Sequence, residues 1–295
     1  MAAKLKINKL VVIGVGLIGG SFALALKRAG AVKLVVGVGR TRGNLTTALG
    51  LGVIDEATRD PALAVEGADL VLLAMPVGQM AALMQRIAPR LSPETVVTDA
   101  GSTKRDVVAY ARRHLSAHLA AFVPAHPIAG TEKSGAGAAF PDLFRGRNVV
   151  LSPLAETAPA AVRTVRAAWQ KCGARVVELG AAEHDAIFAA VSHLPHVVAY
   201  ALVNALSRRR NARELFGFSA GGLRDTVRIA GSSPEMWSDI CLANRDLLLE
   251  ALGDYQDELA RMRAAIGRRD AGALKHMFER ARDARAKWLV NPTNS

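Results

Sequence analysis

A glycine-rich segment near the N-terminus could bind the diphosphate of a dinucleotide. It follows an apolar run typical of a strand, precedes a helical stretch, and has the sequence Gly14-Val15-Gly16-Leu17-Ile18-Gly19. In this fingerprint the first glycine permits a tight turn, the second lets the backbone approach a diphosphate, and the third lets helix and strand pack closely. Free N–H groups at the helix start then face the negative charge. The residues predicted to bind the dinucleotide here are Gly14, Gly16, Leu17, Ile18 and Gly19.

The residues after the second predicted strand indicate which dinucleotide binds. An enzyme that uses NAD normally has an Asp or Glu about 20 residues after the glycine motif, where its carboxylate binds the ribose 2′-hydroxyl. Here the strand is followed by Gly39-Arg40-Thr41-Arg42. The first acidic residue of the chain is Asp55, well beyond that position. Guanidinium and hydroxyl groups suit a 2′-phosphate. We therefore favour NADP, bound by Arg40, Thr41 and Arg42, over the alternative that these are solvated loop residues and NAD binds without a carboxylate.

Polar residues farther along the chain form a second constellation. Its segments are Asp99-Ala100-Gly101-Ser102-Thr103-Lys104, His126-Pro127-Ile128-Ala129-Gly130-Thr131-Glu132, Ser192-His193-Leu194-Pro195-His196 and Asp225-Thr226-Val227-Arg228, with Trp237 beyond. Together with the glycine motif, these segments resemble prephenate dehydrogenase, the arogenate and cyclohexadienyl dehydrogenase family of tyrosine biosynthesis. The resemblance extends from Leu10 to about Leu289. Its separate motifs occur in the family's order, so it is far more specific than a glycine motif alone.

The resemblance implies a role for each matching residue. His126 matches the catalytic histidine that accepts the proton of the substrate's ring 4-hydroxyl, and Ser102 matches a serine that hydrogen-bonds this histidine beside the nicotinamide. Arg228 matches the arginine that binds the carboxylate of the substrate side chain. The other residues expected around the substrate are His196, Ser192, Thr131, Glu132 and Trp237. The family's usual acidic residue after the second strand is Gly39 here, which counts against NAD but not against the family.

The reaction of this family explains these residue types. Prephenate is a cyclohexadienol dianion, and arogenate carries an alanyl side chain in place of the pyruvyl one. The carbinol carbon loses a hydride to nicotinamide, the ring carboxylate leaves as CO2, and the ring becomes aromatic. A neutral histidine can accept the hydroxyl proton near pH 7, and an arginine fork can bind the carboxylate, so no metal is expected. No residue here decides between prephenate and arogenate.

Each candidate also has an ordinary structural interpretation. A histidine before proline, such as His126, could be a hydrogen-bonded core residue, and without the neighbouring motifs that interpretation would be preferred. Arg228 could be a solvated helix arginine, although Asp225, three residues earlier, could position it. Trp237 could serve packing alone.

Histidines in the second half of the chain could suggest a metal site. His184, His193 and His196 are close in sequence, but Pro195 lies between the last two and carboxylates around them are few. We therefore predict no metal. His184, flanked by two acidic residues at a predicted helix start, is interpreted as structural.

The pattern of apolar residues differs between the two parts of the chain, and it predicts the elements that position these residues. Short β-branched runs alternate with helical stretches at first, as expected of buried parallel strands. These runs are Leu10–Ile13, Leu34–Val36, Leu70–Leu73, Thr95–Thr98, Asn148–Leu151 and Arg175–Leu179. Beyond Gly180, helical periodicity continues to about Trp288. We predict an α/β fold: a Rossmann-like, doubly wound, mostly parallel sheet in residues 1–180, followed by an all-α domain in residues 181–295.

Composition argues against several other classes of protein. Hydrophobic residues form 51% of the 295 residues, which is too many for a disordered chain. Cys172 and Cys241 form no CxxC pair, so neither a disulfide framework nor a cysteine-based zinc site is expected. The net charge of +12 is diffuse and no nucleic-acid-reading motif accompanies it, so we expect no nucleic-acid partner. Two alternatives stay open: another NAD(P)-dependent reductase of the β-hydroxyacid type, and a non-catalytic basic protein that binds nucleotides or nucleic acid.

The apolar segments bear on location and assembly. The stretch Leu10–Leu26 follows three lysines, as in a signal peptide, but its removal would delete the glycine motif. We therefore expect a cytoplasmic protein without a membrane segment. The stretches Val197–Leu206 and Leu242–Leu252 predict buried helices. The family resemblance implies a homodimer built from the helical domains, with active sites between the two domains of each chain.

Overall fold

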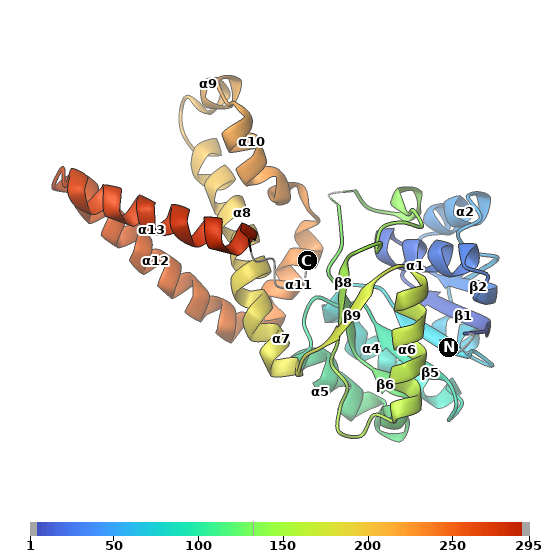
Figure 1. Ribbon diagram of the computed structural model, residues 1–295. Coiled ribbons are helices and arrows are strands. Elements are labelled where there is room, and N and C mark those ends of the chain that lie inside the picture. Colours follow the sequence, from blue (N-terminus) through green and yellow to red (C-terminus); the bar gives the residue numbers. More distant parts are fainter. Residues whose placement is uncertain (1–4, 132, 291–295) are drawn as a thin grey trace.

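Parallel strands and helices alternate through the first half of the chain, as the apolar runs predict. The structure, a computed structural model, describes residues 5–131 and 133–290. Its main sheet has six parallel strands in the order β3-β2-β1-β4-β5-β6 (Figure 1). They are β1 (Ile7–Ile13), β2 (Val32–Val38), β3 (Glu56–Thr58), β4 (Leu70–Leu73), β5 (Val96–Asp99) and β6 (Phe122–Val123). The chain builds outward from β1 to β3 and then returns to β4 on the other side of β1. This doubly wound topology confirms the predicted fold class.

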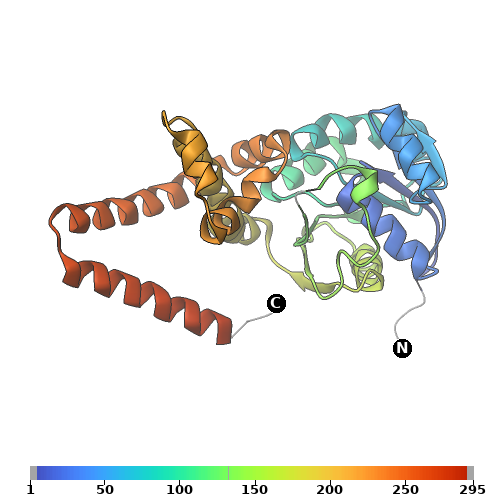
Figure 2. The ribbon, with the colours of Figure 1, turned by 90° about the horizontal axis from the view of Figure 1, so that it is seen from above.

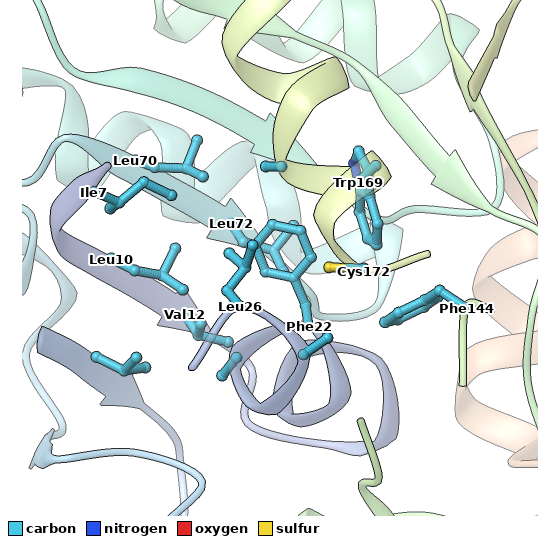
Figure 3. Packing of buried hydrophobic residues seen from close by; sticks show 14 of the residues in the cluster. Ile7, Leu10, Val12, Phe22, Leu26, Leu70, Leu72, Phe144, Trp169 and Cys172 are labelled. Carbon is cyan, nitrogen blue, oxygen red and sulfur yellow. The ribbon is translucent and has the colours of Figure 1, made fainter. Parts of the chain in front are cut away.

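Helices cover both faces of the main sheet. They are α1 (Leu17–Arg28), α2 (Arg42–Gly50), α3 (Pro61–Ala64), α4 (Met80–Ile87), α5 (Arg105–His114) and α6 (Pro159–Lys171), with short 3-10 turns η1 (Val77–Gln79), η2 (Ala88–Arg90), η3 (Ser116–Ala121) and η4 (Ala136–Ala138). Leu10 and Val12 of β1 pack in one layer with Trp169 of α6 (Figure 3). Val11, the residue between them, packs in the opposite layer with Met80 of α4. Burial of each large side chain of this kind stabilises the fold by about 1.5–3 kcal/mol.

A second, smaller sheet differs from the prediction. β7 (Ala125–Pro127) pairs antiparallel with β8 (Asn148–Leu151), which pairs parallel with β9 (Arg175–Glu178). We expected the last two of these strands in the main sheet. Apolar runs predict strands but not their partners, and β3, β6 and β7 are too short to produce a periodic signal. The small sheet matters because His126 is the central residue of β7.

Helices alone follow β9 in the described chain. They are α7 (Ala181–Phe188), the π turn η5 (Ala189–His193), α8 (Leu194–Ser207), α9 (Ala212–Gly217), α10 (Gly221–Val227), the 3-10 turn η6 (Arg228–Gly231), α11 (Pro234–Ala243), α12 (Arg245–Gly267) and α13 (Ala271–Val290). The elements α7, η5 and α8 form one continuous helix. The widened turn η5 lies just before Pro195, which has no N–H to donate to the preceding turn. We call residues up to β9 the α/β half and residues from α7 the helical half.

Much of the apolar surface of the helical half is uncovered. The helices α12 and α13 project from the rest of the molecule as a hairpin (Figure 2). Large apolar side chains on this hairpin are more than half exposed: Leu249, Ile266, Phe278, Trp288 and Leu289. In α8, Ala199 is the one fully buried residue. The predicted burial of these helices is therefore not provided within a single chain, because no other described element covers these faces.

One helical segment, Ala181–Ser207, is long and apolar enough to span a membrane by length and composition. Three of its polar residues, His184, Asp185 and His193, are fully buried and hydrogen-bonded within the protein. Polar groups of this kind are costly in lipid and need partners. Their partners here belong to this chain, so the segment packs as an internal helix at that end.

Candidate functional site

Each glycine of the loop between β1 and α1 has the surroundings that its predicted role requires. Gly14 has a φ of +100°, and a Cβ there would lie 2.2 Å from the Ala74 carbonyl oxygen. A Cβ at Gly19 would lie 2.3 Å from the Gly14 oxygen, which shows how closely α1 packs on β1. A Cβ at Gly16 would meet nothing within 4 Å, so a ligand can approach this backbone. The first turn of α1 has no acidic residue and no side-chain cap, and the loop therefore fits a diphosphate.

Side chains around the glycine loop hold it in place. The side chains of Leu17 and Ile18 pack into the core, so these residues face a ligand with their backbone N–H groups. Asn44 of α2 donates from Nδ2 to the Val15 carbonyl at 2.7 Å and accepts from the Ala136 N–H at 2.9 Å. The Asn44 side chain therefore couples the loop to the start of α2, where the 2′ substituent of the ribose is expected.

The residues predicted to bind a 2′-phosphate lie at the end of β2. A Cβ at Gly39 would lie 3.0 Å from Leu45 Cδ2, so an acidic side chain there would have to displace Leu45. Exposed side chains follow at Arg40, Thr41 and Arg42. Arg40 Nη1 lies 3.5 Å from Glu235 Oε1 of α11, and both side chains are more than half exposed. Such an exposed pair contributes little stability, so a bound phosphate could replace Glu235 as the partner of Arg40.

A fully buried ion pair lies beneath the site. Lys104 Nζ donates to Asp99 Oδ2, and both side chains are 0% exposed. Lys104 also donates to the Ala125 carbonyl at 2.7 Å, and Asp99 Oδ1 accepts from the Ala125 N–H at 3.0 Å. Burial lowers the pKa of Lys104, although the charge of Asp99 opposes this. The pair fixes both backbone groups of Ala125 and therefore the position of the next residue, His126.

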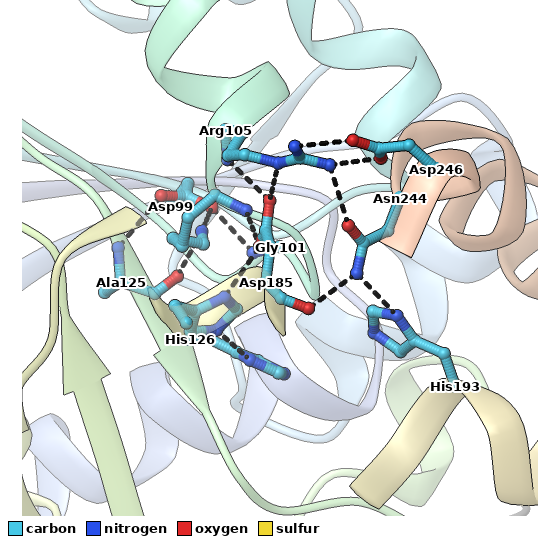
Figure 4. A network of polar contacts seen from close by, with 11 residues as sticks. Asp99, Gly101, Arg105, Ala125, His126, Asp185, His193, Asn244 and Asp246 are labelled. Carbon is cyan, nitrogen blue, oxygen red and sulfur yellow. Dashed lines mark hydrogen bonds and ion pairs between the residues drawn. The ribbon is translucent and has the colours of Figure 1, made fainter. Parts of the chain in front are cut away.

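His126 lies at the end of a buried chain of hydrogen bonds (Figure 4). Its Nδ1 lies 2.8 Å from His184 Nε2, and His184 Nδ1 lies 2.8 Å from Asp185 Oδ1. His184 and Asp185 are 0% exposed, whereas His126 is 9% exposed. Phe188 packs edge-on against the His126 ring, with centroids 4.8 Å apart. Within residues 5–131 and 133–290, the other nitrogen of His126, Nε2, has no hydrogen-bond partner.

Asp185 connects the helical half to the α/β half. Its two carboxylate oxygens accept from the backbone N–H groups of Lys104 and Arg105 at 2.7 and 2.8 Å, at the start of α5. Asn244, just before α12, donates to the Asp185 carbonyl at 2.8 Å. The Arg105 guanidinium in turn donates to Asn244 Oδ1 at 3.1 Å (Figure 4). This network sets where α7 lies relative to β7, and so where His184 meets His126.

Burial lowers the pKa values of the histidines in this network. For His126, burial and then the neighbouring His184 and Lys104 lower the pKa well below the ordinary value of 6.5. Burial also lowers the pKa of His184, although its bond to Asp185 opposes this. For His193, burial lowers the pKa to about 4. These rings are therefore neutral at pH 7, which is the protonation state that a proton acceptor needs.

The helical half brings several of the other predicted residues together. The His196 ring stacks on Trp237, with centroids 3.6 Å apart and planes 20° apart. Its Nδ1 donates to the Ser192 carbonyl at 2.8 Å, which leaves Nε2 as an acceptor. Burial lowers the pKa of His196; the hydrogen bond to Ser192 opposes this shift, and the charge of Arg228 adds to it. The Arg228 side chain is exposed and, among described residues, forms no ion pair with Asp225, because α10 ends one residue before it.

Two other predicted residues, Ser102 and Thr131, make no side-chain hydrogen bond with this group among the described residues. Ser102 is half-buried, and its hydroxyl forms no hydrogen bond with the His126 ring in the described structure, where His184 occupies Nδ1. Thr131 is exposed in the loop after β7 and accepts a hydrogen bond from its own loop backbone. Glu132 lies outside the described residues.

Sequence reasoning missed the residues that complete the hydrogen-bond chain. We expected His184 to be structural, but it contacts the predicted catalytic histidine directly. A His-Asp dipeptide inside an apolar helix was the available signal, since buried polar residues need partners. Lys104 and Asp99 were part of a recognised motif without an assigned role. Asn244 gave no signal, because Asp185 is 59 residues away in sequence.

Comparisons with known proteins agree with the motifs. The family model "Prephenate dehydrogenase, nucleotide-binding domain" matches residues 22–178, and "Prephenate dehydrogenase, dimerization domain" matches residues 180–280. Prephenate dehydrogenase of Bacillus subtilis is 37% identical over 280 residues, which cover 94% of this chain and 75% of that protein. Cyclohexadienyl dehydrogenase of Zymomonas mobilis is 36% identical over 94% of both chains.

A solved structure extends the likeness to three dimensions. Prephenate dehydrogenase from Aquifex aeolicus, crystallised with hydroxyphenyl propionate and NAD+, superposes with a TM-score of 0.88 at 33% identity. The superposition covers 96% of this chain and 99% of that one, so it includes both halves. The chain belongs to the prephenate dehydrogenase family, the NAD(P)-dependent dehydrogenases of tyrosine biosynthesis.

Proposed function

We propose that the chain is a cytoplasmic enzyme that oxidatively decarboxylates prephenate, arogenate or both, with NADP as its preferred cofactor. The products are CO2 and either 4-hydroxyphenylpyruvate, from prephenate, or tyrosine, from arogenate. When bound, the nicotinamide accepts the hydride from the carbinol carbon. The observation that carries this proposal is the position of His126 at the junction of the two halves. Its imidazole is neutral, and one of its nitrogens, Nδ1, is hydrogen-bonded to His184.

The proton of the ring hydroxyl passes to His126 in this mechanism. As hydride leaves the carbinol carbon, the hydroxyl becomes a carbonyl and its proton must move to a base. His126 Nε2 has no protein partner among the described residues and can receive it. When the ring carboxylate leaves as CO2 and the ring becomes aromatic, the ring oxygen recovers the proton. The histidine therefore finishes the cycle neutral, and the reaction needs no other proton donor.

The side-chain carboxylate of the substrate is proposed to bind Arg228. An exposed guanidinium such as that of Arg228 can bind a carboxylate with two parallel hydrogen bonds. We expect Arg228→Ala to raise KM for the substrate by about 10- to 100-fold, with a smaller change in kcat, since a charge-assisted hydrogen bond contributes roughly 1.5–3 kcal/mol. Steady-state kinetics measure this. Arg224→Ala, on exposed α10, is the matched control. Equal effects of the two substitutions on KM would show that Arg228 does not bind the substrate.

The cofactor preference is proposed from the residues after β2. Arg40 and its neighbours supply positive charge where an NAD enzyme has a carboxylate, and Leu45 fills the space beside Gly39. We expect Arg40→Ala to raise KM for NADP by about 10-fold or more, because a guanidinium–phosphate contact is lost, and to leave KM for NAD nearly unchanged. Measurement of both KM values in one variant provides its own control. A parallel rise for both cofactors would contradict a phosphate contact.

One experiment tests the proposed function as a whole. Initial rates are measured with prephenate and with arogenate, each with NADP and with NAD, by absorbance of the reduced nicotinamide. We expect turnover of at least one substrate and a higher kcat/KM with NADP. Absence of turnover in all four combinations would reject the function. Turnover with a clear preference for NAD would reject the cofactor assignment alone.

A homodimer is proposed for the assembled enzyme. Exposed apolar residues on α12 and α13, including Ile266, Phe278 and Trp288, form faces that single soluble chains rarely leave uncovered. The match to a dimerization domain spans residues 180–280, which contain α8 and α12. Sedimentation at micromolar concentration is expected to give a species of twice the chain mass of 31.2 kDa. A single species with the mass of one chain would contradict the dimer.

A further inference from the structure

We propose that His184 and Asp185 are positioning residues for the base: they hold His126 in the tautomer that carries its proton on Nδ1 and leaves Nε2 as the acceptor. The proposal rests on the proposed function, in which His126 takes the substrate proton. The structural observation behind it is a chain of buried hydrogen bonds, 2.8 Å at each step, that has one consistent direction.

The Asp185 carboxylate determines the direction in which the hydrogen bonds of this chain are donated. Each of its oxygens already accepts a backbone N–H, from Lys104 at 2.7 Å and from Arg105 at 2.8 Å. Hydrogen bonds donated to both oxygens stabilise the ionised form of a carboxylate, and an ionised carboxylate has no proton to donate. Burial acts to raise the pKa of Asp185, but the hydrogen bonds from His184 and these backbone groups lower it overall. Asp185 is therefore an acceptor at every bond it makes with its side chain.

The remaining steps follow from the single N–H of a neutral imidazole. Since Asp185 Oδ1 accepts, His184 Nδ1 must donate, and His184 Nε2 is left with a lone pair. That lone pair must accept from His126 Nδ1, 2.8 Å away, so the one proton of the His126 ring is on Nδ1. His126 Nε2 then carries the lone pair. The backbone amides at the start of α5 thus determine, two side chains away, which nitrogen of His126 can act as a base.

The same chain supports the protonated form of His126. Its surroundings otherwise disfavour a positive charge, because the site is buried and Lys104 and His193 lie nearby. When His126 takes up a proton at Nε2, its Nδ1–H bond to His184 becomes charge-assisted, and the negative charge of Asp185 lies beyond His184. The positive charge of Lys104 is paired with Asp99. His184 and Asp185 therefore stabilise the imidazolium at the moment that catalysis requires it, without touching the substrate.

The tautomer can be read directly in the wild-type enzyme. Histidine rings labelled with 15N give well-separated chemical shifts for protonated and unprotonated nitrogens, and His126→Asn identifies the signals of residue 126 by their disappearance. We expect His126 to carry its proton on Nδ1 at pH 7 in the substrate-free protein. A proton on Nε2 would overturn the proposal. This result does not depend on which substrate the enzyme uses, so it is separable from any failure of the proposed function.

A pair of substitutions at His184 then tests the effect on turnover. Glutamine places an amide oxygen near the former Nε2 and can still accept from His126, whereas asparagine reaches about as far as the former Nδ1 and cannot. We expect His184→Asn to lower kcat by about 100-fold, with KM and cofactor affinity changed less than about threefold, and His184→Gln to retain kcat within about tenfold of wild type. We also expect the His126 ring to lose its fixed tautomer in His184→Asn only.

The melting temperatures of the two variants separate positioning from packing. A purely structural role predicts equal losses of kcat in both, in proportion to the loss of stability, and that outcome would overturn the proposal. If His184→Asn fails to fold, the wild-type tautomer and the rescue by His184→Gln still decide the question. If the wild-type enzyme turns over neither prephenate nor arogenate, the proposed function fails while the tautomer measurement stands.

Discussion

Replacement of His126 by Asn is expected to lower kcat by about 100- to 10,000-fold, the range that general base catalysis contributes. Asparagine can keep a donor near the position of Nδ1, and hence the contact with His184, but it has no group at the position of Nε2. The base is therefore lost with little change to the surrounding network. Cofactor affinity should be retained, because the glycine loop lies on other elements. Steady-state kinetics and cofactor titration measure the two effects.

A histidine outside the site provides the control for this substitution. The His118 ring contacts the Ala88 carbonyl, in the α/β half but away from the network, so His118→Asn should leave kcat unchanged. Unchanged turnover in His126→Asn would reject the mechanism.

The pH dependence of kcat/KM is a second check on the role of His126. Burial holds the pKa of His126 well below 6.5, so the ring stays neutral as pH falls through 6.5, and kcat/KM should decline only at more acidic pH. A half-maximal value at pH 6.5 or above would contradict the assigned surroundings of this base.

Replacement of Lys104 by Met is expected to destabilise the protein by about 3–5 kcal/mol, because it leaves a buried carboxylate without its counter-ion. Both members of the pair, Lys104 and Asp99, are 0% exposed. The loss also removes the bond from Lys104 to the Ala125 carbonyl, beside His126. The melting temperature should fall by roughly 10 °C, by the usual relation between unfolding free energy and melting temperature for a chain of this size.

The same substitution at an exposed ion pair separates burial from charge. Lys27 and Asp55 are 2.6 Å apart, but their side chains are 28% and 35% exposed. Water screens such a pair, so Lys27→Met should cost no more than about 1 kcal/mol. Comparable melting temperatures for Lys27→Met and Lys104→Met would show that the buried pair does not contribute as its geometry indicates.

Local sequence patterns were sufficient for the dinucleotide loop. Gly14, Gly16 and Gly19 act through backbone shape and the absence of a Cβ, which depend on residues within one turn of each other. The fold class followed for a similar reason, since continuous apolar runs separated by helices fit buried parallel strands and few other arrangements. The family resemblance then named His126 and Arg228 from motifs that are each contiguous in sequence. In all of these cases the information is local.

Long-range pairing was beyond the sequence patterns. The strand that carries His126 is only three residues long, so it has no apolar periodicity to predict it. Its pairing with β8 places it in a separate sheet, and that pairing is not visible in the sequence. The apolar stretches of α8 and α12 predicted buried helices, but their apolar faces are uncovered in a single chain. Periodicity identifies an apolar face but not what covers it.

The sequence by itself determined the family, and it predicted the dinucleotide loop and the histidine that takes the proton, because each rests on neighbouring residues. Only the tertiary structure decided how that histidine is held. His184 is 58 residues from His126, and Asp185 is 81 residues from the backbone N–H of Lys104 that it accepts. A hydrogen bond requires atoms to meet within about 3 Å at the right angle, and distance along the chain carries no information about that meeting.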